Sequence, residues 1–167
     1  KILKSMKRRY DKELYHNRIK HIRNISANAC IGADVITGFP SETNSDFFET
    51  VNFIETLDIN YLHVFPYSER EGTKSVDISG KVSTASIKNR SKQLRKISLI
   101  KKKNFLKRNV GKIQEVLFES FDNGVLSGFS ENYIRVNVNG KKELLNSVLP
   151  VKINNTDNTD AYGEIIS

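Results

Sequence analysis

Cysteine is almost absent from this sequence, because Cys30 is the one cysteine among 167 residues. A single thiol can form no disulfide within the chain, and it cannot supply the several ligands of a zinc site or a four-iron cluster. The three histidines, His16, His21 and His63, have no spacing that puts two of them on one helix face. The sequence therefore predicts no metal site built from these residues.

Long apolar runs are also missing. No stretch approaches the roughly 20 apolar residues that a membrane helix needs. The basic N-terminal residues are followed by more charge and not by an apolar run, so no signal peptide is predicted. We expect a cytoplasmic protein with no membrane partner.

Positive charge is in excess, with 27 Lys and Arg against 19 Asp and Glu, a formal net charge of +8. It is concentrated in two runs, and such runs favour polyanions, nucleic acid first. The alternative is that each run is the solvated face of a helix. Because two runs occur in one chain, we expect an RNA partner and no DNA. The runs are Lys1, Lys4, Lys7, Arg8 and Arg9, and then Lys88, Arg90, Lys92, Arg95, Lys96, Lys101, Lys102, Lys103, Lys107, Arg108 and Lys112.

The first half of the chain has the pattern of an α/β fold. Apolar spacing predicts a helix over 11–24, and a short apolar run predicts a strand over 29–37 that is buried on both faces. Thr43, with an acid three residues later, predicts the start of a helix, and 60–66 predicts a second strand. Short connections between alternating helices and strands indicate parallel strands.

The second half changes character. Residues 84–108 predict one long basic helix with Ile87, Leu94, Ile97 and Phe105 facing inward. Five short strands then follow, with Asn139-Gly140 predicting a two-residue hairpin. This all-β part is expected to form a small OB-like barrel, a frequent oligonucleotide binder, with the domain boundary near residue 110. The predicted strands are 113–118, 125–129, 132–138, 144–153 and 163–166.

Chemistry is expected where the two α/β strands end. Asp34 in the middle of a buried strand is costly without a partner, and Gly32 beside it clears space of the kind that an approaching ligand needs. Ligands of α/β folds bind at the carboxyl ends of strands, where Gly38-Phe39-Pro40 follows. Arg70, after the second strand, suits a carboxylate or a phosphate. The alternative for Asp34 is a structural acid, that for Gly38-Phe39-Pro40 is a simple turn, and that for Arg70 is an exposed loop arginine.

The all-β part carries a weaker signal. Tyr133 and Arg135 are predicted on one strand face, and Phe129 on the preceding strand. An aromatic ring among cations suits base stacking combined with phosphate attraction. Ordinary sheet packing beside an extended arginine is the alternative.

Three blocks of the sequence together resemble the radical-SAM methylthiotransferases. They are Lys4-Ser-Met-Lys-Arg-Arg-Tyr10, Asp34-Val-Ile-Thr-Gly-Phe-Pro-Ser-Glu-Thr43 and Leu62-His-Val-Phe-Pro-Tyr-Ser-Glu-Arg-Glu-Gly-Thr73. The resemblance implies the C-terminal part of such an enzyme: the end of a radical-SAM (βα) barrel in 1–83, a basic linking helix in 84–110 and an RNA-binding TRAM domain in 111–167.

Within that family, the chain most resembles the branch that methylthiolates threonylcarbamoyladenosine next to the tRNA anticodon, because Leu62-His63-Val64-Phe65 leads into Tyr67-Ser68. The isopentenyladenosine branch, which shares the strand and the later arginine, is the alternative. Asp34 and Arg70 argue against the ribosomal-protein branch.

The resemblance implies cleavage of S-adenosylmethionine by a 4Fe-4S cluster in the intact parent, which also needs tRNA, an electron donor and a sulfur donor. Asp34, Ile36 and Gly38 match the strand that lines the adenosine, and Phe39 and Pro40 shape the turn beneath it. Arg70 is expected at the cofactor. The implied RNA-binding residues are Arg8, Arg9, Lys101, Lys102, Lys103, Tyr133 and Arg135.

The sequence departs from the family in ways that bear on activity. The CxxxCxxC motif that holds the cluster is absent, so this fragment is expected to hold no catalytic residue and to be inactive alone. Ser41 stands where the family usually has glycine, and Asp11 where threonine is common. The alternative function is that of a non-catalytic RNA-binding module. A third hypothesis, an unrelated nucleotide-binding α/β domain, does not explain the all-β part of the chain.

Overall fold

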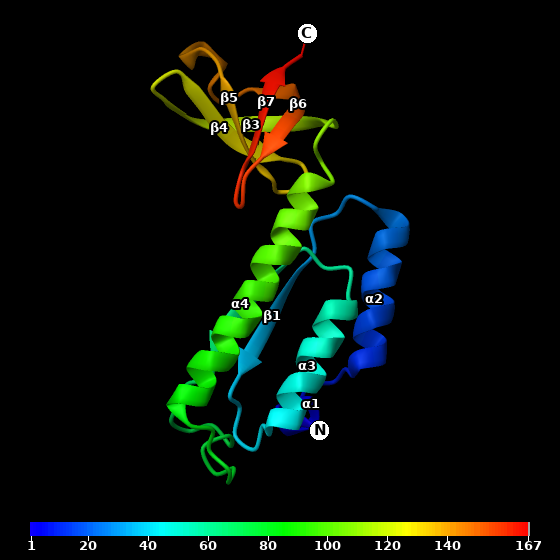
Figure 1. The fold of residues 1–167 in the computed structure, drawn as a ribbon, viewed down its shortest axis with the longest axis vertical. Coiled ribbons are helices and arrows are strands. Elements are labelled where there is room, and N and C mark those ends of the chain that lie inside the picture. The colour runs from blue at the N-terminus through cyan, green and yellow to red at the C-terminus, as the bar shows by residue number, and fades with distance from the viewer. Residues whose placement is uncertain (167) are drawn as a thin grey trace. The chain divides into compact units, whose positions relative to one another are not determined.

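The computed structural model describes residues 1–166, which form two compact units divided between Ser98 and Leu99. Figure 1 shows the elements in chain order. The first unit contains two parallel strands and several helices, of which the last, α4, continues into the second unit. Its elements are α1 (Ile2–Ser5), α2 (Lys12–Ile25), β1 (Gly32–Thr37), α3 (Asn44–Thr56), β2 (Tyr61–Pro66) and α4 (Thr84–Lys107).

The predicted helix starts are confirmed, with their capping side chains. Asp11 caps α2 by accepting a hydrogen bond from the Leu14 backbone N–H at 2.9 Å. Thr43 and Asp46 form a full capping box at the start of α3. Aspartate therefore replaces the family's threonine before α2 without loss, since both side chains cap well.

The predicted parallel strands are also confirmed. β1 pairs with β2 in a single register in which Asp34 lies opposite His63 and Ile36 opposite Phe65. Within the described residues of the first unit the sheet has these two strands, so the α/β class holds but a radical-SAM barrel is not shown.

The prediction that the first strand is buried on both faces is wrong. Ile31 and Ala33 face a core that also contains residues of α2, α3 and α4, such as Phe47 and Leu94. On the opposite face, Asp34 is exposed. All three helices contribute to the core on the Ile31 and Ala33 face of the strand. The opposite face stays open at Asp34, so its carboxylate is not removed from water and bears no desolvation cost.

A buried ion pair holds the turn after β1. The Glu42 carboxylate oxygen Oε2 accepts hydrogen bonds from Arg90 Nη1 on α4 at 2.6 Å and from the Gly38 backbone N–H at 2.7 Å. Arg90 Nη2 also donates to Asn44 Oδ1 at 2.8 Å. The two charged side chains are only 5% and 7% exposed. Arg90, which was counted among the cations available to a polyanion, is therefore committed inside the protein.

Two residues of this turn adopt left-handed backbone. Gly38 has φ +80°, and a Cβ there would lie 2.3 Å from Ile87 Cγ1, so only glycine fits. Ser41 has φ +68°, and its N–H donates to the Gly80 carbonyl at 2.8 Å. The left-handed conformation gives a physical reason for the glycine that the family usually has at Ser41.

The second unit is a small closed barrel with strand order β3-β4-β5-β7-β6, as predicted for a small barrel after an α/β part. β5 and β7 pair in parallel, and the other pairs are antiparallel. Because α4 runs through the junction, the division at residues 83 and 110 stays a prediction. The elements are β3 (Ile113–Asp122), β4 (Val125–Ser130), β5 (Arg135–Asn139), the short 3-10 helix η1 (Lys142–Leu144), β6 (Val148–Thr156) and β7 (Ala161–Ile165).

The hairpin predicted at Asn139-Gly140 is wrong, because β5 pairs with β4 and β7. The two-residue hairpin instead forms at Asn123-Gly124, where φ is +48° and +84° and β3 turns into β4. The strand predicted over 144–153 begins only at Val148, since η1 precedes it.

We expect Ser41→Gly to stabilise the first unit by about 0.5–1 kcal/mol. Relief of left-handed strain, about 1–2 kcal/mol, outweighs the added chain entropy of glycine, about 0.4–1 kcal/mol. Thermal unfolding of the full chain measures the change. Ser26→Gly is the matched control, because Ser26 is exposed with φ −139° and glycine relieves nothing there. Equal destabilisation by both substitutions would contradict the strain at Ser41.

Candidate functional site

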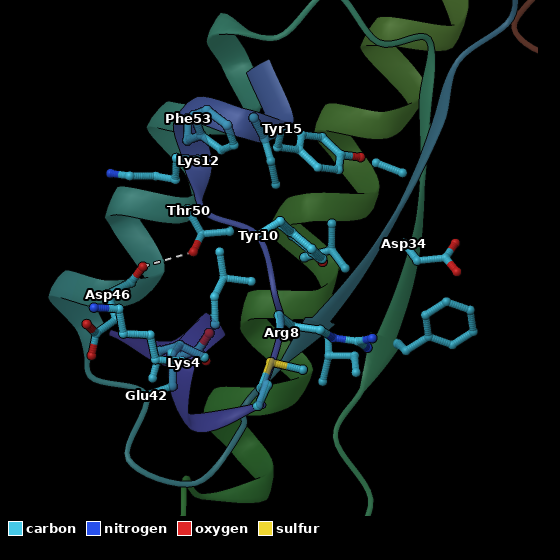
Figure 2. Close-up of a pocket in the computed structure, with 18 of the residues that line it drawn as sticks. Lys4, Arg8, Tyr10, Lys12, Tyr15, Asp34, Glu42, Asp46, Thr50 and Phe53 are labelled. Atoms are coloured by element: carbon cyan, nitrogen blue, oxygen red, sulfur yellow. Dashed lines mark hydrogen bonds between the residues drawn. The ribbon is translucent and has the colours of Figure 1, made fainter. Parts of the chain in front are cut away.

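The first unit contains a cavity of about 1000 Å³ beside β1. Its walls come from α1, from residues 8–12, from α3 and from the loop that follows β2. In the view of Figure 2, Arg8, Tyr10 and Tyr15 lie between Asp34 and the α3 residues Thr50 and Phe53. The volume is in the range of small-molecule and cofactor sites.

Several residues predicted from sequence meet in this cavity. Asp34 and Ile36 reach it from β1, and Arg70 from the loop after β2. Arg8 and Arg9 line it from the link between α1 and α2. Residues more than 60 positions apart in the sequence therefore surround one space.

Some charged side chains of the cavity lining have partners, and others have none within residues 1–166. Among the described residues, the guanidinium groups of the three arginines form no ion pair, and the Asp34 carboxylate forms no hydrogen bond or ion pair. The four other acids of the lining are engaged: Asp46 by Lys1 at 3.4 Å, Glu49 by Lys12, Glu42 by Arg90, and Asp11 by the Leu14 backbone N–H. The three arginines, Lys4 and the Asp34 carboxylate are thus available to a ligand with an anionic group and with hydroxyls or amines.

Aromatic rings in the lining were missed from the sequence. Burial, with smaller contributions from the charges of Tyr10 and Asp34, raises the pKa of Tyr15 above its ordinary value of 10.0. Tyr15 therefore stays neutral near pH 7. Phe65 and Tyr67 also line the cavity. The alternation of aromatic residues along β2 was the signal that could have indicated them. Phe65 lies opposite Ile36, which was predicted to line the site.

The turn Gly38-Phe39-Pro40 does not line the cavity itself. All three residues are buried. The Phe39 ring packs edge-on against Tyr67, with 5.4 Å between ring centroids, and Tyr67 lies in the cavity wall. Phe39 therefore supports the site from behind, through Tyr67.

Cationic residues are concentrated outside the barrel. Residues 84–112 contain eleven Lys and Arg and no acid, whereas residues 113–167 contain eight acids and four basic residues, a formal charge of −4. Of the predicted phosphate contacts, Lys103 is exposed and Lys101 and Lys102 are half-buried. In the second half of the chain, the excess of positive charge therefore lies in 84–112.

The expectation that Tyr133 and Arg135 share one strand face is wrong. β5 begins at Arg135, and Tyr133 lies in the preceding turn with φ +59° and 80% exposure. The turn forms because the Ser130 N–H bonds to the Ile134 carbonyl. Arg135 lies opposite Phe129 on β4, and its Nε is 3.8 Å from Asp160.

Two features are absent from residues 1–166, the part of the chain that the structure describes. No helix among them is long and apolar enough to span a membrane. No group of three or more His, Cys, Asp or Glu among them is arranged to hold a metal ion.

The relatives of this chain among known proteins include several synthases of one name, whereas no protein-family profile matches the chain. The tRNA-2-methylthio-N(6)-dimethylallyladenosine synthase of Aliarcobacter butzleri is 33% identical over 172 residues, which cover 99% of this chain and 38% of the relative. The synthase of the same name from Campylobacter jejuni subsp. jejuni is 36% identical over 168 residues, with the same coverage. The one from Endomicrobium trichonymphae is 32% identical over 170 residues, 40% of its length.

These names do not support the expected threonylcarbamoyladenosine branch, and they match the alternative instead. Leu62-His63-Val64-Phe65 was too short a segment to separate two branches that share the rest of the strand and loop. Over 99% of its length, the chain is similar to tRNA-2-methylthio-N(6)-dimethylallyladenosine synthases, and it spans about two fifths of their length.

Proposed function

We propose that this chain is part of a radical-SAM tRNA methylthiotransferase that acts on dimethylallyladenosine, the isopentenyladenosine branch of the family. The observation that carries the proposal is the similarity of almost the whole chain to three synthases of that name. The small barrel after an α/β part and the three sequence blocks support it.

In this proposal the cavity beside β1 holds S-adenosylmethionine. The uncommitted Asp34 carboxylate suits the ribose hydroxyls, Ile36 suits the adenine ring, and Arg70 suits the methionine carboxylate through its fork of donors. Within the turn Gly38-Phe39-Pro40, Phe39 supports the cavity wall from behind, through Tyr67. When bound in the intact parent, S-adenosylmethionine supplies the radical that activates the adenosine carbon. A second molecule of S-adenosylmethionine supplies the methyl group.

The residues described do not fit a 4Fe-4S cluster. Such a cluster is held by several cysteine thiolates, whereas the chain has Cys30 alone. No step of the reaction can therefore be assigned to these residues, and the catalytic activity, the electron donor and the sulfur donor belong to the proposed intact parent.

The tRNA is proposed to contact the basic segment 84–112. Its cations meet no acid within the segment, and Lys101, Lys102 and Lys103 lie near its middle. Arg8 and Arg9 at the cavity mouth, and Tyr133 and Arg135 on the second unit, complete the proposed RNA-binding residues. The same charge supports a second candidate, a non-catalytic RNA-binding module.

A chimeric enzyme tests the proposed activity. We expect that the Campylobacter jejuni synthase, with its matching segment replaced by this chain, methylthiolates tRNA carrying dimethylallyladenosine. Mass spectrometry of the nucleosides measures the product. Asp34→Ala in the chimera should raise the KM for S-adenosylmethionine, while Asp77→Ala, in an exposed stretch outside the cavity lining, should not. Modification of threonylcarbamoyladenosine instead would contradict the assigned branch.

The purified chain alone is expected to bind no iron–sulfur cluster and no S-adenosylmethionine tightly. One cysteine cannot ligate four irons, and two strands provide only one wall of the cofactor site. Anaerobic reconstitution followed by visible spectroscopy and calorimetry checks both. A stoichiometric cluster absorbance on the monomer would refute the expectation.

Binding of tRNA is expected to weaken steeply as salt rises, because phosphate contacts release counterions. Replacing Lys101, Lys102 and Lys103 with glutamine should lower the log–log salt slope by up to about three, at roughly one per phosphate contact. Replacing Lys141, Lys142 and Lys152 of the acidic barrel removes the same charge and should change the slope much less. Equal effects of the two triple variants would argue against a binding segment at 84–112.

A further inference from the structure

Tyr133 combines backbone strain with exposure. A bulky residue rarely adopts positive φ, because Cβ then crowds the following carbonyl. Yet Tyr133 has φ +59°, and 80% of the residue is exposed to solvent. Burial of the ring therefore does not offset the strain. Strained residues persist where the surroundings fix them, and they are concentrated at functional sites.

The turn before β5 is fixed by hydrogen bonds on both sides of Tyr133. The Ser130 N–H donates to the Ile134 carbonyl, and the Tyr133 N–H to the Ser130 carbonyl, each at 2.9 Å. The Ile134 N–H also donates to Ser130 Oγ at 3.0 Å. Ile134 is 1% exposed and anchors the turn in the barrel core.

A buried amide network extends from this turn to the end of α4. Ser130 Oγ donates to Asn132 Oδ1 at 2.7 Å, and Asn132 Nδ2 donates to Asn109 Oδ1 at 3.2 Å. Asn109 Oδ1 also accepts from Gln114 Nε2 at 3.1 Å, and Asn109 Nδ2 donates to the Phe105 carbonyl at 2.8 Å. Ser130, Asn132, Asn109 and Gln114 are all buried. The turn that presents Tyr133 is thus joined to the last turn of the basic helix.

We propose that Tyr133 is a stacking platform for an unpaired RNA base, held in place by the Asn109–Asn132 network. The inference rests on the proposed binding of tRNA and adds the kind of RNA that this surface selects. A base stacks on an aromatic ring whatever its identity, and a ring fixed in advance loses little entropy on binding.

The charge distribution favours RNA as the partner of this ring. Lys107, Arg108 and Lys112 flank Asn109 in the sequence, so cations lie on the segment to which the network ties the turn. The barrel itself carries −4 and offers the ring little electrostatic help. The two contributions therefore separate: the basic segment attracts phosphates of any RNA, and Tyr133 selects RNA with unpaired bases, because bases in a duplex are already stacked.

The test compares a fluorescent 12-nucleotide single-stranded RNA with its duplex, using the full chain. Tyr133→Ala should weaken binding of the single strand by roughly 5- to 150-fold, the range for one stacked base, and leave duplex binding within about twofold. Tyr133→Phe should retain binding of both. Equal losses for the two RNAs, or no loss, would overturn the stacking role.

Glycine at the same position separates function from strain. Tyr133→Gly should lose single-strand binding as Tyr133→Ala does, yet melt several degrees higher than the alanine variant, because only glycine relieves the positive φ. Asn146→Gly, at an exposed residue with φ +63°, is the matched control and should leave RNA binding unchanged. A glycine variant that melts below the alanine variant would show that the ring is not held under strain.

A double-mutant cycle of Asn132 and Tyr133 tests the network. Asn132→Ala should weaken single-strand binding, and Tyr133→Ala should cost little more when Asn132 is already alanine, because both act through one ring. Additive losses would remove the positioning role. A wild-type chain that binds neither RNA would overturn the proposed tRNA binding as well. Salt-dependent binding of both RNAs that is indifferent to Tyr133→Ala would overturn this inference alone.

Discussion

The Glu42–Arg90 ion pair is the interaction on which the first unit depends. Its carboxylate joins the end of β1, through the Gly38 N–H, to the N-terminal half of α4, and Arg90 reaches Asn44 at the start of α3. Loss of either partner would leave a buried charge, a change that costs about 3–5 kcal/mol in proteins. Since Asp34 and Ile36 lie on the strand that ends at this clamp, the pair also sets the wall of the cavity.

Local patterns predicted the elements, and contacts between distant residues decided the remainder. Periodicity was sufficient for α2, α3 and α4 and for the existence of the barrel strands, but not for where β5 and β6 begin. Glu42 and Arg90 are 48 positions apart, so no window contains both. The exposure of Asp34 depends on which sheet face the helices cover, and β1 alone cannot specify that. Asn123-Gly124 and Asn139-Gly140 carry the same turn signal, and only the strand pairing selects the first.

The separation of charge between the basic segment and the barrel changes how the proposed RNA contact is understood. A barrel with a formal charge of −4 adds little attraction for RNA, so in the proposed contact its role is one at short range, after the basic segment has bound the backbone. Stacking is such a role, because it needs contact with a base and no net charge. In this proposal, attraction by the second unit's part of the basic segment, 99–112, and selection by Tyr133 are joined at Asn109.

Ser41 and Tyr133, two residues with positive φ, show how buried polar contacts offset backbone strain. Ser41 lies next to Glu42, and its N–H is satisfied by Gly80, so the clamp fixes the turn whatever the side chain. Its hydroxyl has no assigned role, and glycine would serve the turn equally well. Tyr133 is held by a comparable network, yet its side chain is large and directed into solvent. Strain that a smaller residue would relieve indicates a constraint other than folding, and the exposed ring is the feature that glycine would remove.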